Sequence, residues 1–264
     1  MILGANPSHV ASAQPEFSGR SDAEDFGVGG DMIEISVLGP LTVRNGGEEI
    51  LGLSVGTKRL LAFLALRPRG ARLAISGEMW PDVTERRASD SLRSALTRLE
   101  DAIKPAITMT PAGLSLAPGV AVDLNVARES ARRLLQPGAA STPDDLSTWA
   151  IEAFASRILP DWYDEWVLSE VEDWRQLRLH ALEAQAEMLI TEGNLRAAAW
   201  AARAAMRVEP LRQSAIVSLI RVHLAEGNQS EALRDYDIYK ALLERELGLE
   251  PTAILSDLVA PFRR

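Results

Sequence analysis

The chain has 264 residues, of which 47% are hydrophobic, and a formal net charge of −9. This length suffices for about two domains with hydrophobic cores, which excludes a small stapled scaffold. Because there is no cysteine, a disulfide framework, a thiolate nucleophile and cysteine-ligated zinc are also excluded. No apolar run approaches the roughly 18–20 residues of a membrane span and no secretory signal is present, so we expect a cytoplasmic protein without a membrane partner.

The charge is distributed unevenly along the chain. Residues 1–30 have a net charge of −3, residues 31–122 of +1 and residues 123–264 of −7. Residues 1–30 lack apolar periodicity and hold few aromatic side chains, so we expect a disordered tail there. The sequence predicts two further parts, a nearly neutral module over residues 31–122 and an acidic domain over residues 123–264.

The pattern of residues 31–122 is that of a small sheet followed by helices and a hairpin. Apolar and polar residues alternate over residues 33–43 with a break at Gly39-Pro40, which predicts an antiparallel sheet. Helical runs follow at 57–66 and 75–80.

The clearest predicted helix begins at Thr84 and continues to Ile103. Its apolar residues form one stripe, which consists of Ala88, Leu92, Ala95, Leu96, Leu99 and Ile103. Beyond it, alternating residues at 107–110 and 114–116 flank a turn and predict a β-hairpin. Strands, three helices and a hairpin in this order predict a winged helix-turn-helix, an α+β module.

Residues 123–264 have a helical pattern almost throughout and contain an internal repeat. Gly193-Asn194 recurs 34 residues later as Gly227-Asn228, with Ala198 and Ala232 at the same offset. Alanine at helix crossings with this period is typical of tetratricopeptide repeats. We therefore expect a mainly α protein, in which the winged helix precedes an all-α, tetratricopeptide-like helical repeat domain.

The sequence offers little material for catalysis. Its three histidines lie far apart, and no catalytic, metal-binding or phosphate-loop motif occurs. We expect no enzyme activity, no catalytic residues, no metal site and no cofactor.

The third predicted helix presents a polar face that could read DNA. The face opposite the apolar stripe and its flanks carry Arg86, Arg87, Arg93, Ser94, Thr97 and Arg98. Arginine can bind guanine or phosphate, and serine and threonine can reach base edges or the backbone. Such a face also occurs on ordinary solvated helices, but its place between two helices and a hairpin favours a recognition helix. The hairpin would be the wing, with Thr108 and Thr110 as candidate DNA contacts.

Other charged residues bear on this hypothesis. Asp90, Glu100 and Asp101 would repel phosphate, so a single module should bind DNA weakly and a second copy would help. Lys58 and Arg59, at the start of the first helix, could bind a phosphate at its N-terminus or could simply be a solubilising pair.

Four of the six tryptophans lie within 26 positions of the acidic domain, at 149, 162, 166 and 174. Core packing of the helices and a groove for a partner both remain open as explanations.

Several segments of the chain match motifs of a known family. Those of the first half are Val37-Leu-Gly-Pro-Leu41, Lys58-Arg-Leu-Leu-Ala-Phe-Leu-Ala-Leu66, Met79-Trp-Pro-Asp82 and Ser91-Leu-Arg-Ser-Ala-Leu-Thr-Arg-Leu99. Those of the second half are Leu159-Pro-Asp-Trp-Tyr-Asp-Glu-Trp166, Pro210-Leu-Arg-Gln-Ser-Ala215, Ala225-Glu-Gly-Asn228, Glu231-Ala-Leu233 and Glu246-Leu-Gly-Leu-Glu-Pro251. From Ile33 onwards the chain resembles the antibiotic regulatory protein (SARP) family of actinobacterial transcription activators, in which a winged helix precedes a bacterial transcriptional activation domain (BTAD). It departs from the family pattern where Glu100-Asp101 replace a basic pair and where Gln213 replaces a glutamate.

The resemblance implies a sequence-specific activator in the bacterial cytoplasm, associated with the nucleoid. Such proteins bind double-stranded DNA at direct repeats upstream of promoters, often as side-by-side pairs, and contact RNA polymerase, notably its sigma factor. Two other hypotheses stay open, a repeat-based adaptor whose winged helix makes only protein contacts and an unrecognised enzyme. The adaptor would show no salt-dependent binding to DNA.

Overall fold

The computed structural model describes residues 32–139 and 141–263, and the tail predicted over residues 1–30 lies outside this part. The N-terminal sheet has the strand order β3-β2-β1-β7. Its strands are β1 (Ile33–Ser36), β2 (Thr42–Asn45), β3 (Glu48–Glu49) and β7 (Ala121–Val122). β1 and β2 are antiparallel, with Ile35 opposite Val43, which confirms the predicted alternation. β7 runs parallel to β1 and was not predicted, because two residues carry no periodic signal.

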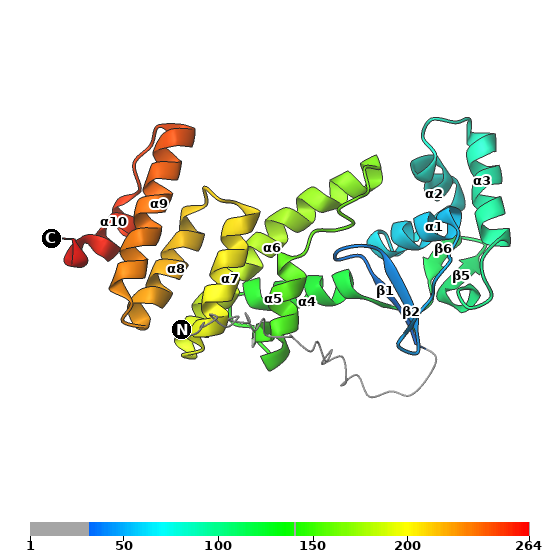
Figure 1. Cartoon of the computed structure of the whole chain (residues 1–264). Helices are drawn as coiled ribbons and strands as arrows, with labels where there is room; N and C mark the ends of the chain where they lie inside the picture. The colour runs from blue at the N-terminus through cyan, green and yellow to red at the C-terminus, as the bar shows by residue number, and fades with distance from the viewer. Residues whose placement is uncertain (1–31, 140, 264) are drawn as a thin grey trace, which may run out of the picture. The chain divides into compact units, whose positions relative to one another are not determined.

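Three helices and a second sheet complete the N-terminal module (Figure 1, blue to green). The helices are α1 (Val55–Leu66), α2 (Arg72–Met79) and α3 (Glu85–Thr97), and a short 3₁₀ turn, η1 (Lys104–Ala106), follows them. The second sheet has the order β4-β6-β5, formed by β4 (Arg69–Gly70), β5 (Ile107–Thr110) and β6 (Gly113–Leu116). A Cβ atom at Gly113 would lie 2.0 Å from the carbonyl oxygen of Gly70, so only glycine allows β4 to approach the hairpin this closely.

The third predicted helix is shorter than its apolar stripe. α3 ends at Thr97 with Arg98 at its C-cap, so the predicted extension to Ile103 is wrong. Leu99 and Ile103 are still buried, but from a turn that follows the helix. In this turn the carboxylate of Glu100 accepts a hydrogen bond from the Ser54 N–H at the start of α1. The segment after Thr97 is therefore held by a hydrogen bond to a residue distant in the sequence and does not continue as a helix.

The C-terminal part is helical, as predicted (Figure 1, green to red). Its elements are α4 (Asp123–Leu135), η2 (Pro143–Leu146), α5 (Thr148–Ala155), α6 (Glu165–Thr191), α7 (Leu195–Val208), α8 (Gln213–Ala225), α9 (Gln229–Leu247), α10 (Ala253–Val259) and η3 (Ala260–Phe262). Gly193 and Gly227 lie in equivalent turns of two helix hairpins, each with a positive φ, of 79° and 74°. Ala198 and Ala232 are fully buried, which agrees with close helix crossings at the repeated positions.

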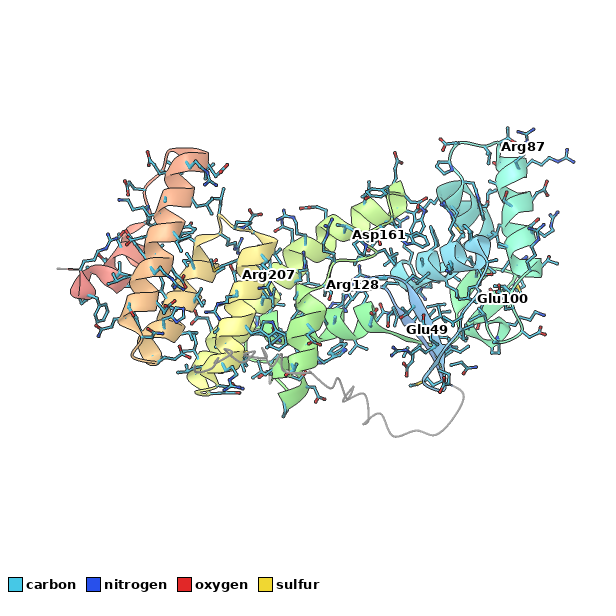
Figure 2. The ribbon with its side chains drawn as sticks, viewed as in Figure 1. Glu49, Arg87, Glu100, Arg128, Asp161 and Arg207 are labelled. Atoms are coloured by element: carbon cyan, nitrogen blue, oxygen red, sulfur yellow. The ribbon has the colours of Figure 1, made fainter. Side chains whose placement is uncertain are left out.

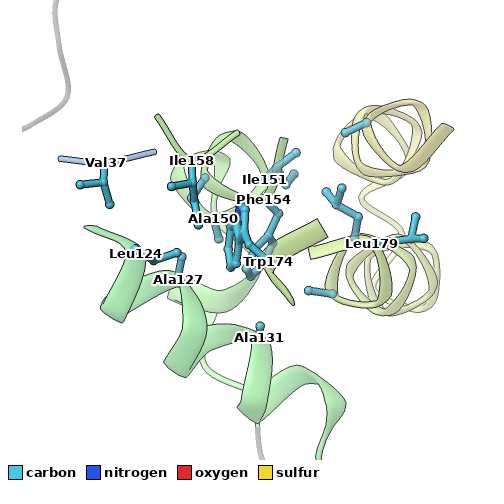
Figure 3. Packing of buried hydrophobic residues seen from close by; sticks show 14 of the residues in the cluster. Val37, Leu124, Ala127, Ala131, Ala150, Ile151, Phe154, Ile158, Trp174 and Leu179 are labelled. Carbon is cyan, nitrogen blue, oxygen red and sulfur yellow. The ribbon is translucent and has the colours of Figure 1, made fainter. Parts of the chain in front are cut away.

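The two parts of the chain are joined by the carboxylate of Asp123, the first residue of α4. Its oxygens accept hydrogen bonds from the backbone N–H groups of Val37 at 2.9 Å, of Leu38 at 3.1 Å and of Leu124 at 2.7 Å. Val37 packs beside Leu124 and Ile158 in the same region (Figure 3). At the predicted boundary between residues 122 and 123, hydrogen bonds and apolar packing therefore connect β1 to α4.

A second contact joins α1 to α6. The rings of Phe63 and Trp166 meet edge to face with 5.2 Å between their centroids, and the guanidinium of Arg59 pairs with the Asp164 carboxylate at 2.8 Å. Trp166 and Trp174 are buried, whereas Trp149 is 44% exposed. Core packing therefore explains the buried tryptophans of the cluster, and a partner groove lined by all four is excluded.

We predict that Asp123→Ala destabilises the protein by about 1–3 kcal/mol, because three backbone N–H groups lose their side-chain acceptor. Burial raises the pKa of the Asp123 carboxyl, since desolvation outweighs these hydrogen bonds. A raised pKa in the folded state means that this group's contribution to stability falls as the pH rises through that pKa. The stability difference between wild type and variant should therefore be larger at acid than at neutral pH. Urea unfolding at both pH values measures it, and a difference that shrinks in acid would contradict the assignment.

Candidate nucleic-acid interface

α3 buries one face and exposes the other, as an amphipathic helix should. Its buried residues are Ala88, Leu92 and Ala95. The predicted contact residues on its outer side are all exposed, namely Arg86, Arg87, Arg93, Ser94, Thr97 and Arg98. Figure 2 shows Arg87 projecting outward from the first half of this helix. The structure therefore brings these six side chains together on one helix and its C-cap.

Two of the contact residues already have partners on their own helix. Arg93 pairs with Asp90 at 3.1 Å, and both side chains are more than half exposed. The Thr97 hydroxyl donates to the Arg93 carbonyl oxygen at 2.8 Å. An exposed pair of this kind contributes little to stability. The Arg93 guanidinium can therefore leave Asp90 for a base or a phosphate at small energetic cost.

A hollow of the surface lies beside the exposed face of α3. It is lined from α3 and its C-cap by Arg87, Ser94 and Arg98, and from the start of α1 by Val55 and Gly56. Two guanidinium groups and a hydroxyl thus border one depression, together with the Asp90 carboxylate, which pairs with Arg93. This arrangement can hold an anionic chain that passes along α3.

The hairpin of β5 and β6 forms the predicted wing. Thr108 and Thr110 lie on the same side of β5, with Thr110 exposed and Thr108 half-buried. Met109, between them, is 56% exposed. Arg69 on β4 is also exposed and pairs in register with Ser115 of β6. Sequence reasoning missed Arg69 as a wing residue, because the Arg67-Pro-Arg-Gly70 segment indicated only the end of a helix.

The structure does not group Arg59 with this face. Its Nη2 atom donates to the Met79 carbonyl oxygen at 2.7 Å, and the same atom forms the ion pair with Asp164. Arg59 therefore links α1 to α2 and α6. Lys58, one residue earlier, is exposed in the first turn of α1.

The N-terminus of α1 already has an anionic partner, which is Glu100. One carboxylate oxygen accepts from the Ser54 N–H at 3.0 Å, and the other from the Thr57 hydroxyl at 2.9 Å. Burial raises the pKa of Glu100, but these hydrogen bonds outweigh it and leave the pKa below its ordinary value. A carboxylate here disfavours a phosphate at the same helix end. The geometry therefore gives no support to the hypothesis that Lys58 and Arg59 hold a phosphate there.

Two further titratable side chains, His223 and Asp101, form pairs within the protein. His223 is buried and its Nε2 atom lies 3.2 Å from an Asp235 carboxylate oxygen, while Asp101 pairs with Lys104 at 2.6 Å. Within residues 32–139 and 141–263, no group of three histidine, cysteine, aspartate or glutamate side chains could hold a metal ion.

In the same part of the chain, no helix is both long enough and apolar enough to cross a bilayer.

The chain is similar to two curated regulatory proteins. It is 28% identical over 242 residues to "Regulatory protein AfsR" of Streptomyces coelicolor, a match that covers 86% of this chain and 24% of that protein. It is 26% identical over 244 residues to the protein of the same name from Streptomyces griseus, with coverage of 86% and 24%. The chain thus spans about a quarter of the length of these relatives.

A solved structure has a similar fold. "Mycobacterium tuberculosis EmbR in complex with low affinity phosphopeptide" matches with a TM-score of 0.57 and 21% sequence identity, covering 87% of this chain and 64% of that one. This likeness confirms the expected fold class, a mainly α chain in which a winged helix precedes helical repeats.

The model of a protein family described as "Bacterial transcriptional activator domain" matches residues 122–261. This match covers more than half of the chain and, with the AfsR relatives, confirms the resemblance to the antibiotic regulatory protein family. The chain belongs to the bacterial transcriptional activator domain family.

Proposed function

We propose that this chain is a sequence-specific, DNA-binding transcriptional activator that recruits RNA polymerase through its helical domain. The observation that carries the proposal is the exposed face of α3, on which six polar or cationic side chains lie together beside a wing. The relatives supply the class of function, since they are regulatory proteins. DNA recognition itself is inferred from the chemistry of the face.

Each group on this face has a role in the proposed complex. Arg93 and Thr97, opposite the buried stripe, contact base edges in the major groove, where arginine binds guanine through two hydrogen bonds. Arg86, Arg87 and Arg98 contact phosphates, which position the helix without reading sequence. The wing, with Thr108 and Thr110 and the neighbouring Arg69, contacts the adjacent backbone or minor groove.

The proposed complex contains paired copies of the chain. Residues 31–122 have a net charge of only +1, so one module gains little from release of counterions. Asp90 on the same helix lowers the affinity further. Two copies side by side on direct repeats would contact twice as many phosphates and bases.

The helical domain would supply the contact with the transcription machinery. Residues 123–264 carry a net charge of −7, which suits them poorly to lie along DNA. An acidic surface of this kind complements a basic protein surface. We propose that this partner is RNA polymerase, with the sigma factor as the subunit contacted.

The second candidate is an adaptor that binds proteins through its helical repeats and has no specific affinity for DNA. It is favoured by the nearly neutral charge of residues 31–122. The two candidates differ in the dependence of DNA affinity on salt. A DNA-binding activator loses affinity steeply as salt rises, and an adaptor shows no specific binding at any salt concentration.

We predict that Arg93→Ala weakens binding to a selected DNA site by about 1–3 kcal/mol and relaxes the preference at one base position. Arg44→Ala is the matched control, because Arg44 is also an exposed arginine but lies on β2, away from α3. Fluorescence anisotropy with labelled duplexes over a salt series measures both variants. If Arg93→Ala binds like the wild type at every salt concentration, the assignment of this face is wrong.

We predict different effects for two changes at Glu100, one on affinity and one on specificity. Glu100→Gln keeps an oxygen that can accept from Ser54 but removes the charge, so affinity for all duplexes should rise by about two- to fivefold. Glu100→Ala removes the hydrogen bonds that hold the turn after α3 against α1, so the ratio of specific to non-specific affinity should fall. Anisotropy on matched and scrambled duplexes separates the two effects. An unchanged ratio in Glu100→Ala would show that this contact does not position α3.

A further inference from the structure

The surface of α7 has an unusual composition for this acidic domain. Between Leu195 and Val208 the helix contains seven alanines, three arginines and no acidic residue. Its alanines at positions 198, 199, 201, 202, 204 and 205 are buried, and the helix packs against α5, α6 and α8. All the charge of α7 therefore lies on its exposed side and has one sign.

Four side chains form a continuous line on that side, which we call the α7 stripe. They are Arg196, Trp200, Arg203 and Arg207, spaced at i, i+4, i+7 and i+11. Residues with this spacing share one helix face and here cover about 16 Å along the axis. The three arginines are exposed and Trp200 is half-buried, and Figure 2 marks Arg207 on this helix.

The arginines of the α7 stripe have no carboxylate partner among the described residues. Other arginines of the helical domain do pair: Arg132 with Glu129, Arg212 with Glu183, Arg221 with Glu187 and Arg234 with Glu231. The Glu209 carboxylate, which follows the end of α7, is bound by Arg175. In a domain with a large excess of acidic groups, three aligned and unpaired guanidinium groups are available to another molecule.

We propose that the α7 stripe is a docking surface for an acidic segment of another protein. Guanidinium groups bind carboxylates through paired hydrogen bonds. Tryptophan, methionine and arginine are enriched at protein interfaces, and Met206 lies half-buried beside the stripe. This composition favours a protein partner over the backbone of a nucleic acid.

The docking surface goes beyond the proposed function, which assigns DNA contacts to α3 and gives the helical domain a basic partner. It depends on neither assignment, because an acidic segment can bind α7 whether or not α3 binds DNA. Loss of DNA binding in Arg93→Ala and loss of peptide binding at α7 are separate observations.

The test compares two triple variants of the full chain that change the net charge equally. The first, Arg196→Gln/Arg203→Gln/Arg207→Gln, removes the stripe. The control, Arg132→Gln/Arg234→Gln/Arg245→Gln, removes arginines that are also exposed but are paired with Glu129, Glu231 and Glu246. The probe is a short peptide rich in glutamate and leucine, titrated into isotope-labelled protein while the α7 amide and Trp200 indole signals are followed by NMR.

We expect saturable, salt-sensitive shifts confined to α7 and Trp200 in the wild type and the control. The stripe variant should bind the peptide about tenfold more weakly or not at all. Equal weakening in both variants would show that the peptide responds only to net charge, which would overturn the proposal. A wild-type protein that does not bind the peptide would also overturn it. A duplex DNA probe that shifts the same signals, with a lower salt slope in the stripe variant, would make the stripe a nucleic-acid surface instead. The double variant Arg203→Gln/Arg207→Gln gives the same comparison if the triple variant does not fold.

Discussion

The burial of α1 on all sides from Leu60 onwards is the constraint on which the arrangement of the chain depends. Residues 60–66 of this helix are buried without interruption, so every face of the helix needs apolar cover. The N-terminal module covers part of it through α2, α3 and β6, and α6 covers another part through Trp166. The hydrophobic core of the winged helix is therefore completed by the helical domain.

Because of this shared core, two charged residues, Arg59 on α1 and Glu100 after α3, bind protein groups instead of solvent. Arg59 reaches Asp164 and the Met79 carbonyl, while Glu100 binds the start of α1. The Arg59 contact fixes the position of α6 relative to α1, and the Glu100 contact fixes that of α3. Glu100, which departs from the basic pair usual in the family, thus has a structural role. Its hydrogen bonds lower its pKa, so the carboxylate keeps its negative charge.

The elements with regular periodicity could be predicted from the sequence. The alternation around Ile35, the apolar face of α3 and the repeated Gly193 and Gly227 turns each leave a local pattern, because side chains recur with the period of the strand, helix or repeat. The two-residue strands β4 and β7 could not be predicted, since their pairing depends on residues distant in the sequence. The end of α3 was misplaced because the apolar stripe continues into a turn, which is held by a contact with a residue distant in the sequence.

The candidate site could be predicted to a similar extent. Helical projection placed Arg93 and its neighbours on the outer face correctly, since that needs only the helical period. It could not show that Arg59 pairs with a residue 105 positions away, nor that Arg69 joins the wing through β4. The α7 arginines are aligned in the sequence as well, but only the folded chain shows that the Glu209 carboxylate, just after α7, is bound by Arg175.

Sequence-specific DNA binding by this chain can be measured by selecting fragments that the full chain binds from a random duplex pool, at low and at physiological salt. We expect enrichment of one short motif, repeated in the same orientation about 10–11 base pairs or a multiple apart, with recovery that falls steeply as salt rises. Recovery of no enriched sequence, or recovery that does not depend on salt, would contradict this expectation.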